Sequence, residues 1–96
     1  MFTSPHIHSY RERIRVNNEL ITESDIEKYL THIFNVIESE KIDITWFEIT
    51  NMLAFLKFKD EKVDFGVFEA GIGGRLDSTN VLNPSICAIT SVGYDH

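Results

Sequence analysis

Two short apolar segments of this chain each end in small and polar residues. The first, residues 63–68, runs through Glu69 into a Gly-rich loop, and the second, residues 86–91, runs on to Asp95 and His96. Short apolar runs are typical of parallel strands that are covered on both faces of the sheet. Because ligands bind outside the carboxyl ends of such strands, the sequence predicts a ligand site at that edge.

Two helices are predicted ahead of these strands. Ser24 and Glu27 have the spacing of a capping box, so a helix should begin there, with its apolar residues on one face. A second helix should begin near Thr45, with Glu48 as its capping partner, and apolar residues cover most of its circumference. Burial on more than one side is the best explanation for such a helix. The pattern predicts an α/β fold with a partial doubly wound, mostly parallel sheet and flanking helices.

Composition and charge exclude several classes of protein. The chain has 96 residues, enough for one domain at most, and 9 basic against 15 acidic residues give a net charge of −6. This balance disfavours partners such as nucleic acids and anionic membranes. No apolar run approaches the roughly 20 residues that span a bilayer, and the amino end lacks the blocks of a signal peptide. The single cysteine, Cys87, agrees with a reducing compartment, so we expect a cytoplasmic location.

Three polar residues could meet around one metal ion at the predicted edge of the sheet: Ser4, Glu69 and His96. A hydroxyl and a carboxylate suit Mg²⁺, which is shared with nucleotide phosphates. Imidazole is an uncommon ligand for Mg²⁺, so the residue types alone leave manganese and zinc open. His6 and His8 do not predict a zinc site, because no cysteine or third histidine has the supporting spacing.

Several motifs occur together along the chain: Thr3-Ser-Pro-His-Ile7, Arg11-Glu-Arg-Ile-Arg-Val16, Trp46-Phe-Glu48, Glu69 through Leu82, and Thr90 through His96. In these motifs and their order the chain resembles the folylpolyglutamate synthase and dihydrofolate synthase family, ATP-dependent amide ligases related to the Mur ligases. The resemblance implies the P-loop central domain of Mur ligases. In that family a strand, a Gly-rich phosphate loop and a helix precede the position of Thr3. We therefore expect residues 1–96 to be a fragment of the amino-terminal ATP-binding domain, lacking its first strand and phosphate loop and the carboxy-terminal glutamate-ligase domain.

The resemblance also implies roles for particular residues. It implies that Mg²⁺ is held by Ser4, Glu69 and His96. It implies contacts with the pterin end of the substrate from three loop residues, Leu76, Asp77 and Ser78, and contacts with pteroate from the segment Thr45, Trp46, Phe47 and Glu48, where Phe47 would stack on a ring.

Each of these roles has a structural alternative. Asp77 could accept hydrogen bonds from the amino-pterin edge, or it could form an Asx turn within its loop. The segment that begins at Thr45 could serve only as a helix start with packed aromatic residues. Arg11, Arg13 and Arg15 alternate as on the edge of a strand, where they could attract the anionic glutamate tail or ATP, or form a solvated face.

The resemblance implies the activity of a longer parent enzyme, expected to be a monomer. The parent would join L-glutamate to dihydropteroate and to folates, using ATP and passing through an acyl phosphate. We expect the 96 residues alone not to catalyse this ligation, since they contain no phosphate-loop lysine motif. The alternatives are a related Mur-type amide ligase, a non-catalytic remnant, and a pterin-binding module.

Overall fold

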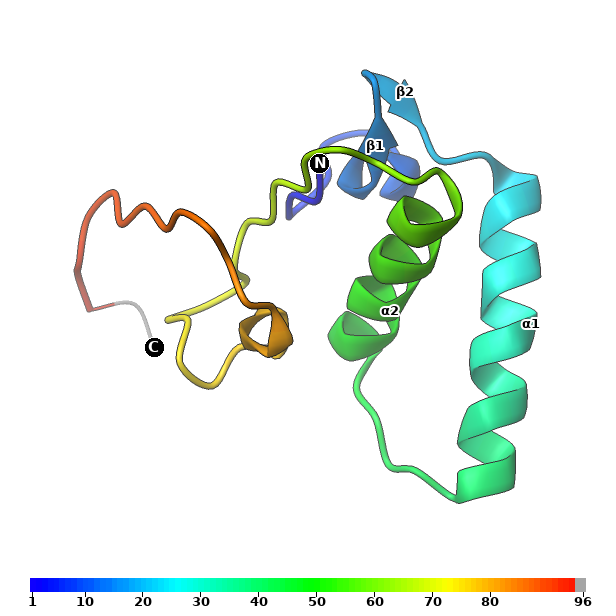
Figure 1. The fold of residues 1–96 in the computed structure, drawn as a ribbon. Helices are drawn as coiled ribbons and strands as arrows, with labels where there is room; N and C mark the ends of the chain where they lie inside the picture. The colour runs from blue at the N-terminus through cyan, green and yellow to red at the C-terminus, as the bar shows by residue number, and fades with distance from the viewer. Residues whose placement is uncertain (95–96) are drawn as a thin grey trace.

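The computed structural model describes residues 1–94. The elements, in chain order, are the 3₁₀ helix η1 (Tyr10–Arg13), strands β1 (Arg15–Val16) and β2 (Glu19–Leu20), helices α1 (Glu23–Glu40) and α2 (Trp46–Asp60), and the 3₁₀ helix η2 (Ser78–Val81). The two long helices lie side by side, and the segment after η2, residues 83–94, lies away from both of them (Figure 1). Within residues 1–94, no helix combines the length and the apolar character needed to cross a membrane.

Helix α1 is capped by Thr22 rather than by Ser24. The Thr22 hydroxyl accepts a hydrogen bond from the Asp25 amide at 3.0 Å, and Ser24 already lies inside the helix. Ile21, just before the cap, is fully buried, so its place in the core fixes where the extended chain turns into the helix. The predicted capping box of Ser24 and Glu27 is therefore wrong, although the predicted helix is confirmed.

The capping box predicted for the second helix is confirmed. The Glu48 amide donates to the Thr45 hydroxyl at 3.3 Å, and the Thr45 amide donates to the Glu48 carboxylate at 2.7 Å. Burial on several sides of α2 is confirmed as well, because its buried residues are Ile49, Thr50, Asn51, Leu53, Ala54 and Phe58.

Three polar contacts join the helices in antiparallel order, among them an ion pair between Lys28 of α1 and Asp60 of α2 at 3.5 Å. Lys57, near the end of α2, pairs with Asp25 in the first turn of α1 at 2.7 Å. The Tyr29 hydroxyl of α1 donates to Asp60 at 2.7 Å. These contacts fix the register of the two helices over a shared apolar core.

The sheet in the described residues is an antiparallel hairpin, with Arg15 opposite Leu20 and Val16 opposite Glu19. Asn17 and Asn18 form its turn with φ angles of 51° and 66°, a left-handed geometry that asparagine tolerates well.

The doubly wound parallel sheet is not formed within residues 1–94. The strands predicted over residues 63–68 and 86–91 have no ladder there, and parallel pairing is reduced to one bridge, between Phe2 and Phe68. A strand exists only where a neighbour accepts and donates its backbone hydrogen bonds. Residues 83–94 are exposed throughout and have no such neighbour in the described part of the chain.

Phe2 stands at the centre of the fold. On one side its amide donates to the Val67 carbonyl at 2.8 Å, and its carbonyl accepts from the Glu69 amide at 2.9 Å. On the other side it forms an antiparallel bridge with Ile14. Its ring is 0% exposed and lies about 6 Å, between centroids, from the rings of Phe47 and Phe68. Phe2 therefore joins the hairpin, α2 and the Gly-rich loop.

Replacing Phe2 with alanine should lower the free energy of unfolding by about 3–5 kcal/mol, the usual cost of removing a buried aromatic side chain. The matched control is Phe34→Ala, since the Phe34 side chain on α1 is 46% exposed, and its cost should be about 1 kcal/mol or less. Urea unfolding followed by circular dichroism measures both. Equal losses in the two variants would contradict the central role of Phe2.

Candidate functional site

The structure brings Ser4 and Glu69 together. The parallel bridge between Phe2 and Phe68 aligns the two segments, and the Ser4 amide donates to Glu69 Oε2 at 3.0 Å. Ser4 is half-buried, and Glu69 is exposed. The peptide bond between Ser4 and Pro5 is cis. His96, the third predicted metal ligand, lies outside the described residues.

A hydroxyl and a carboxylate at one place give this pair the oxygen donors that Mg²⁺ prefers. The Ser4 contact is made by the backbone amide to one oxygen of Glu69, so it does not use the Ser4 hydroxyl or Glu69 Oε1. Within residues 1–94, no group of three or more histidine, cysteine or acidic side chains is placed to hold a metal ion. The described residues thus supply an oxygen pair that fits part of a hard-cation site.

Asp77 organises the Gly-rich loop around its own carboxylate. Oδ2 accepts hydrogen bonds from the amides of Gly71 at 2.8 Å and Ile72 at 3.0 Å. Oδ1 accepts from the Thr79 amide at 2.9 Å and from its hydroxyl at 2.6 Å. Four donors are about as many as an ionised carboxylate accepts. The Asx turn given as the structural alternative is therefore present, and the predicted contact with a pterin stays a prediction.

The charge of Asp77 is stabilised by this arrangement although the residue is buried. Burial by itself raises the pKa of the carboxyl group, but the hydrogen bonds from Thr79, Ile72 and Gly71 outweigh it, and the net pKa lies below the ordinary value. Asp77 is therefore ionised at neutral pH.

Glycines allow this loop to lie against α2. A side chain at Gly71 would meet the Phe47 ring at 2.6 Å, so only glycine permits this close approach. Gly73 and Gly74 have φ angles of 70° and 131°, which disfavour other residues. The loop therefore packs on Phe47, and Leu76 at its tip is 86% exposed.

Asn51 is a candidate that the sequence analysis missed. It is fully buried on α2, and its side-chain amide donates to the Ser78 hydroxyl of η2, which joins the helix to the loop. Its Oδ1 atom is buried and has no hydrogen-bond partner in the described part of the chain. The available signal was a polar residue amid the apolar positions of the second helix.

The start of α2 places its four predicted site residues in different surroundings. Thr45 and Glu48 bond to each other in the capping box, and bonds from the Thr45 amide and hydroxyl lower the pKa of Glu48. Phe47 lies between Phe2 and the Gly-rich loop. Trp46 points elsewhere: the residue is 58% exposed, and its ring centroid lies 6.2 Å from that of Tyr10.

The three arginines do not form the strand edge that their alternation suggested, because Arg11 and Arg13 lie in η1 and only Arg15 begins β1. Arg11 Nε donates to the Ile21 carbonyl at 2.6 Å, and Arg15 Nε donates to the Glu12 carbonyl at 3.2 Å. These two side chains tie the amino-terminal segment together. Arg13 Nε instead donates to another side chain, that of His6.

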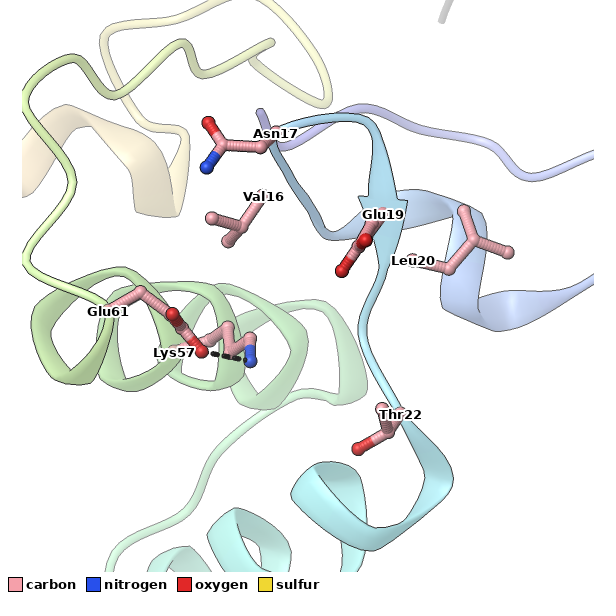
Figure 2. Close-up of a pocket in the computed structure, with 7 residues that line it drawn as sticks. All are labelled: Val16, Asn17, Glu19, Leu20, Thr22, Lys57 and Glu61. Atoms are coloured by element: carbon pink, nitrogen blue, oxygen red, sulfur yellow. Dashed lines mark hydrogen bonds and ion pairs between the residues drawn. The ribbon is translucent and has the colours of Figure 1, made fainter.

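A hollow of about 200 Å³ lies between the hairpin and α2 (Figure 2). Its lining includes Lys57, whose ammonium group is held by Asp25 and Glu61, each at 2.7 Å. Two carboxylates already compensate this charge, so the hollow offers no free cation to an anionic ligand. Its lining shares no residue with the Ser4 and Glu69 pair.

Order in the Gly-rich loop should depend on pH through Asp77. Because the folded pKa is lowered, the stabilisation is complete above the unfolded value of about 3.9 and is lost as the pH falls through the lower folded pKa. Protection of the Gly71 and Ile72 amides from hydrogen exchange, measured relative to the intrinsic rate at each pH, should fall in that window. Asp77→Asn should remove this pH dependence and loosen the loop at neutral pH; an unchanged profile in this variant would contradict the assignment.

Comparisons with known proteins find similar sequences and a similar solved structure, although no family model matches the chain. The chain is 43% identical over 100 residues to the dihydrofolate synthase/folylpolyglutamate synthase of Bacillus subtilis. The matched region covers 99% of this chain and 23% of that protein. It is 42% identical over 101 residues to the folylpolyglutamate synthase of Arabidopsis thaliana, covering 100% of this chain and 16% of that protein. The chain thus spans about a fifth of the length of these curated relatives.

A solved structure agrees with these matches. The crystal structure of folylpolyglutamate synthase from Thermotoga maritima superposes with a TM-score of 0.81 at 40% identity, covering 86% of this chain and 21% of that one. The resemblance identified from the motifs is confirmed. Along its whole length, the chain is homologous to one segment of the proteins in the folylpolyglutamate synthase and dihydrofolate synthase family.

Proposed function

We propose that this chain contributes metal-binding and folate-binding residues to an ATP-dependent ligase that joins L-glutamate to dihydropteroate and folates. The observation that carries the proposal is the contact between Ser4 and Glu69, which are 65 residues apart in sequence. Two motifs that identify the family thereby meet at one place. The similarity of the whole chain to named synthases supports the same function.

The metal would be Mg²⁺, held by the Ser4 hydroxyl, the Glu69 carboxylate and His96. When bound, Mg²⁺ neutralises charge on a phosphoryl group during its transfer. The chain's own contribution is to align the oxygen donors: the Phe2 backbone fixes both segments, and the Ser4 amide orients one oxygen of Glu69. The other oxygen of Glu69 is the one that would face the ion.

The pterin would lie against Phe47, beside the loop that contains Leu76, Asp77 and Ser78. Phe47 contacts Gly71 on one side and Phe2 on the other, so its ring is held in place by packing. Because the Asp77 oxygens already hold four donors, the role proposed for Asp77 is to keep the loop that would contact the pterin in shape. The exposed Leu76 would cover the ring.

In the proposed reaction, the substrate carboxylate attacks the γ-phosphate of ATP and gives an acyl phosphate, with ADP as the leaving group. The amine of L-glutamate then attacks the acyl carbon, forms the amide bond and releases phosphate. The residues of this chain bind and orient, and none acts as a nucleophile. Since the 96 residues include no phosphate-loop lysine motif, ATP binding would need further residues of the parent enzyme.

Binding of dihydropteroate to the full chain tests the folate part of this proposal. Phe47→Ala should weaken binding by about tenfold, because aromatic stacking together with ring burial contributes about 1.5 kcal/mol. Phe34→Ala removes a ring of the same size on α1 and should leave binding unchanged. Isothermal titration calorimetry measures the affinities; a folded chain that does not bind dihydropteroate, or that binds it equally in both variants, would overturn the pterin assignment.

A further inference from the structure

Arg13 lies in a cluster of aromatic side chains from separate parts of the chain. Its Nε atom donates to His6 Nδ1 at 2.8 Å, and its guanidinium carbon lies 5.7 Å from the centre of the Tyr10 ring. The Tyr10 ring packs edge-on against His6 at 6.0 Å and lies 6.2 Å from the Trp46 ring. We call these four residues, His6, Tyr10, Arg13 and Trp46, the Arg13 cluster.

The Arg13 cluster is anchored on one side and open on the other. The Tyr10 hydroxyl shares a 2.7 Å hydrogen bond with the hydroxyl of Thr50, which is fully buried on α2. His6 and Trp46, in contrast, are exposed. Because Tyr10 is held by Thr50 and its neighbours His6 and Trp46 are exposed, the cluster is a preformed stacking surface, and little ordering of side chains is needed when a ligand binds to it.

Arg13 brings a positive charge to this surface without an acidic partner. Among residues 1–94, no carboxylate forms an ion pair with it, although the chain has a net charge of −6. The neighbouring Glu12 is already used, since its oxygens accept hydrogen bonds from the amides of Ile7 and His8. Among residues 1–94, only Nε of Arg13 forms a hydrogen bond, so the terminal nitrogens keep the paired N–H groups that recognise a carboxylate.

We propose that the Arg13 cluster binds an aromatic carboxylate, that is, a flat ring that carries a carboxylate group. The ring would stack on Tyr10 and Trp46, and the carboxylate would pair with the guanidinium group of Arg13. A phosphate or an aliphatic acid would use the charge but not the rings. The geometry therefore favours a ligand that has both groups.

The cluster adjoins the candidate metal and pterin site. The Arg13 carbonyl accepts from the Thr3 amide at 3.0 Å, next to Ser4, and Trp46 precedes Phe47 at the start of α2. This inference rests on the proposed function for the natural ligand: Phe47 takes the pterin half of a pteroate, and the Arg13 cluster takes its 4-aminobenzoate half.

The test compares 4-aminobenzoate with its neutral amide, 4-aminobenzamide, on the full chain. Saturation-transfer NMR of the ligand ring protons gives both affinities. The acid should bind about tenfold more tightly than the amide, as expected for a charge-assisted hydrogen bond. Arg13→Gln should weaken binding of the acid by about tenfold and remove the difference between the ligands. Arg13→Lys keeps the positive charge but not the paired N–H groups, so its affinity for the acid should lie between those of the unaltered chain and Arg13→Gln.

Lys41→Gln is the matched control, because it removes one positive charge from an exposed position at the end of α1. Both ligands should bind this variant as they bind the unaltered chain. Slow exchange of the Thr3 amide, which bonds to the backbone of Arg13 rather than to its side chain, reports whether Arg13→Gln keeps its fold.

The outcomes separate this inference from the proposed function. Equal affinity for acid and amide in the unaltered chain would overturn the inference without any variant. Dihydropteroate binding that depends on Phe47 but not on Arg13 would leave the proposed function standing and overturn the inference. A folded chain that binds neither 4-aminobenzoate nor dihydropteroate would overturn both.

Discussion

The backbone hydrogen bonds of the first three residues hold together segments that are far apart in the sequence. One side of this segment bonds to residues 67 and 69, and the other side bonds to Arg13 and Arg15. Buried amides and carbonyls must be paired, and here each bond also aligns two segments. The contact of Ser4 with Glu69, the position of η1 and the packing of Phe47 all follow from this alignment. The candidate site at Ser4 and Glu69 thus depends on a few backbone contacts around one buried ring.

In the loops of this chain, side-chain carboxylates accept hydrogen bonds from backbone amides, as backbone carbonyls do between the strands of a sheet. Hydrogen bonds from the amides of Ser9, Ile7 and His8 lower the pKa of Glu12 to about 2. Asp77 holds the Gly-rich loop in the same way, and Glu48 accepts a hydrogen bond from the Thr45 amide in the capping box of α2. Each group is charged at neutral pH and offers acceptors to amides that would otherwise lack partners. Order in these turns therefore persists while the acids remain ionised.

The sequence predicted what local patterns determine. The capping box of Thr45 and Glu48 is a short-range arrangement, as is the apolar spacing of both helices, and both features appear as expected. The cap at Thr22 depends on where Ile21 is buried, which no local pattern specifies. A parallel strand forms only beside a neighbouring strand. The apolar sequence of residues 86–91 therefore indicates that this segment is able to form a strand, but not that a neighbour is present. The motifs indicated that Ser4 and Glu69 meet, but the backbone contact that joins them requires the fold.

Two consecutive residues at the start of α2 point to two different environments. Successive side chains on a helix are separated by about 100° around its axis. Phe47 therefore faces the Gly-rich loop and Phe2, while Trp46 faces Tyr10 within the Arg13 cluster. The capping box fixes the first turn of α2 and therefore the directions of the Trp46 and Phe47 side chains. A ligand that crosses this turn would meet a packed ring on one side and an open ring beside a cation on the other. The helix start thus links the two halves of the proposed site through rigid backbone geometry, without any side chain that has to reach both.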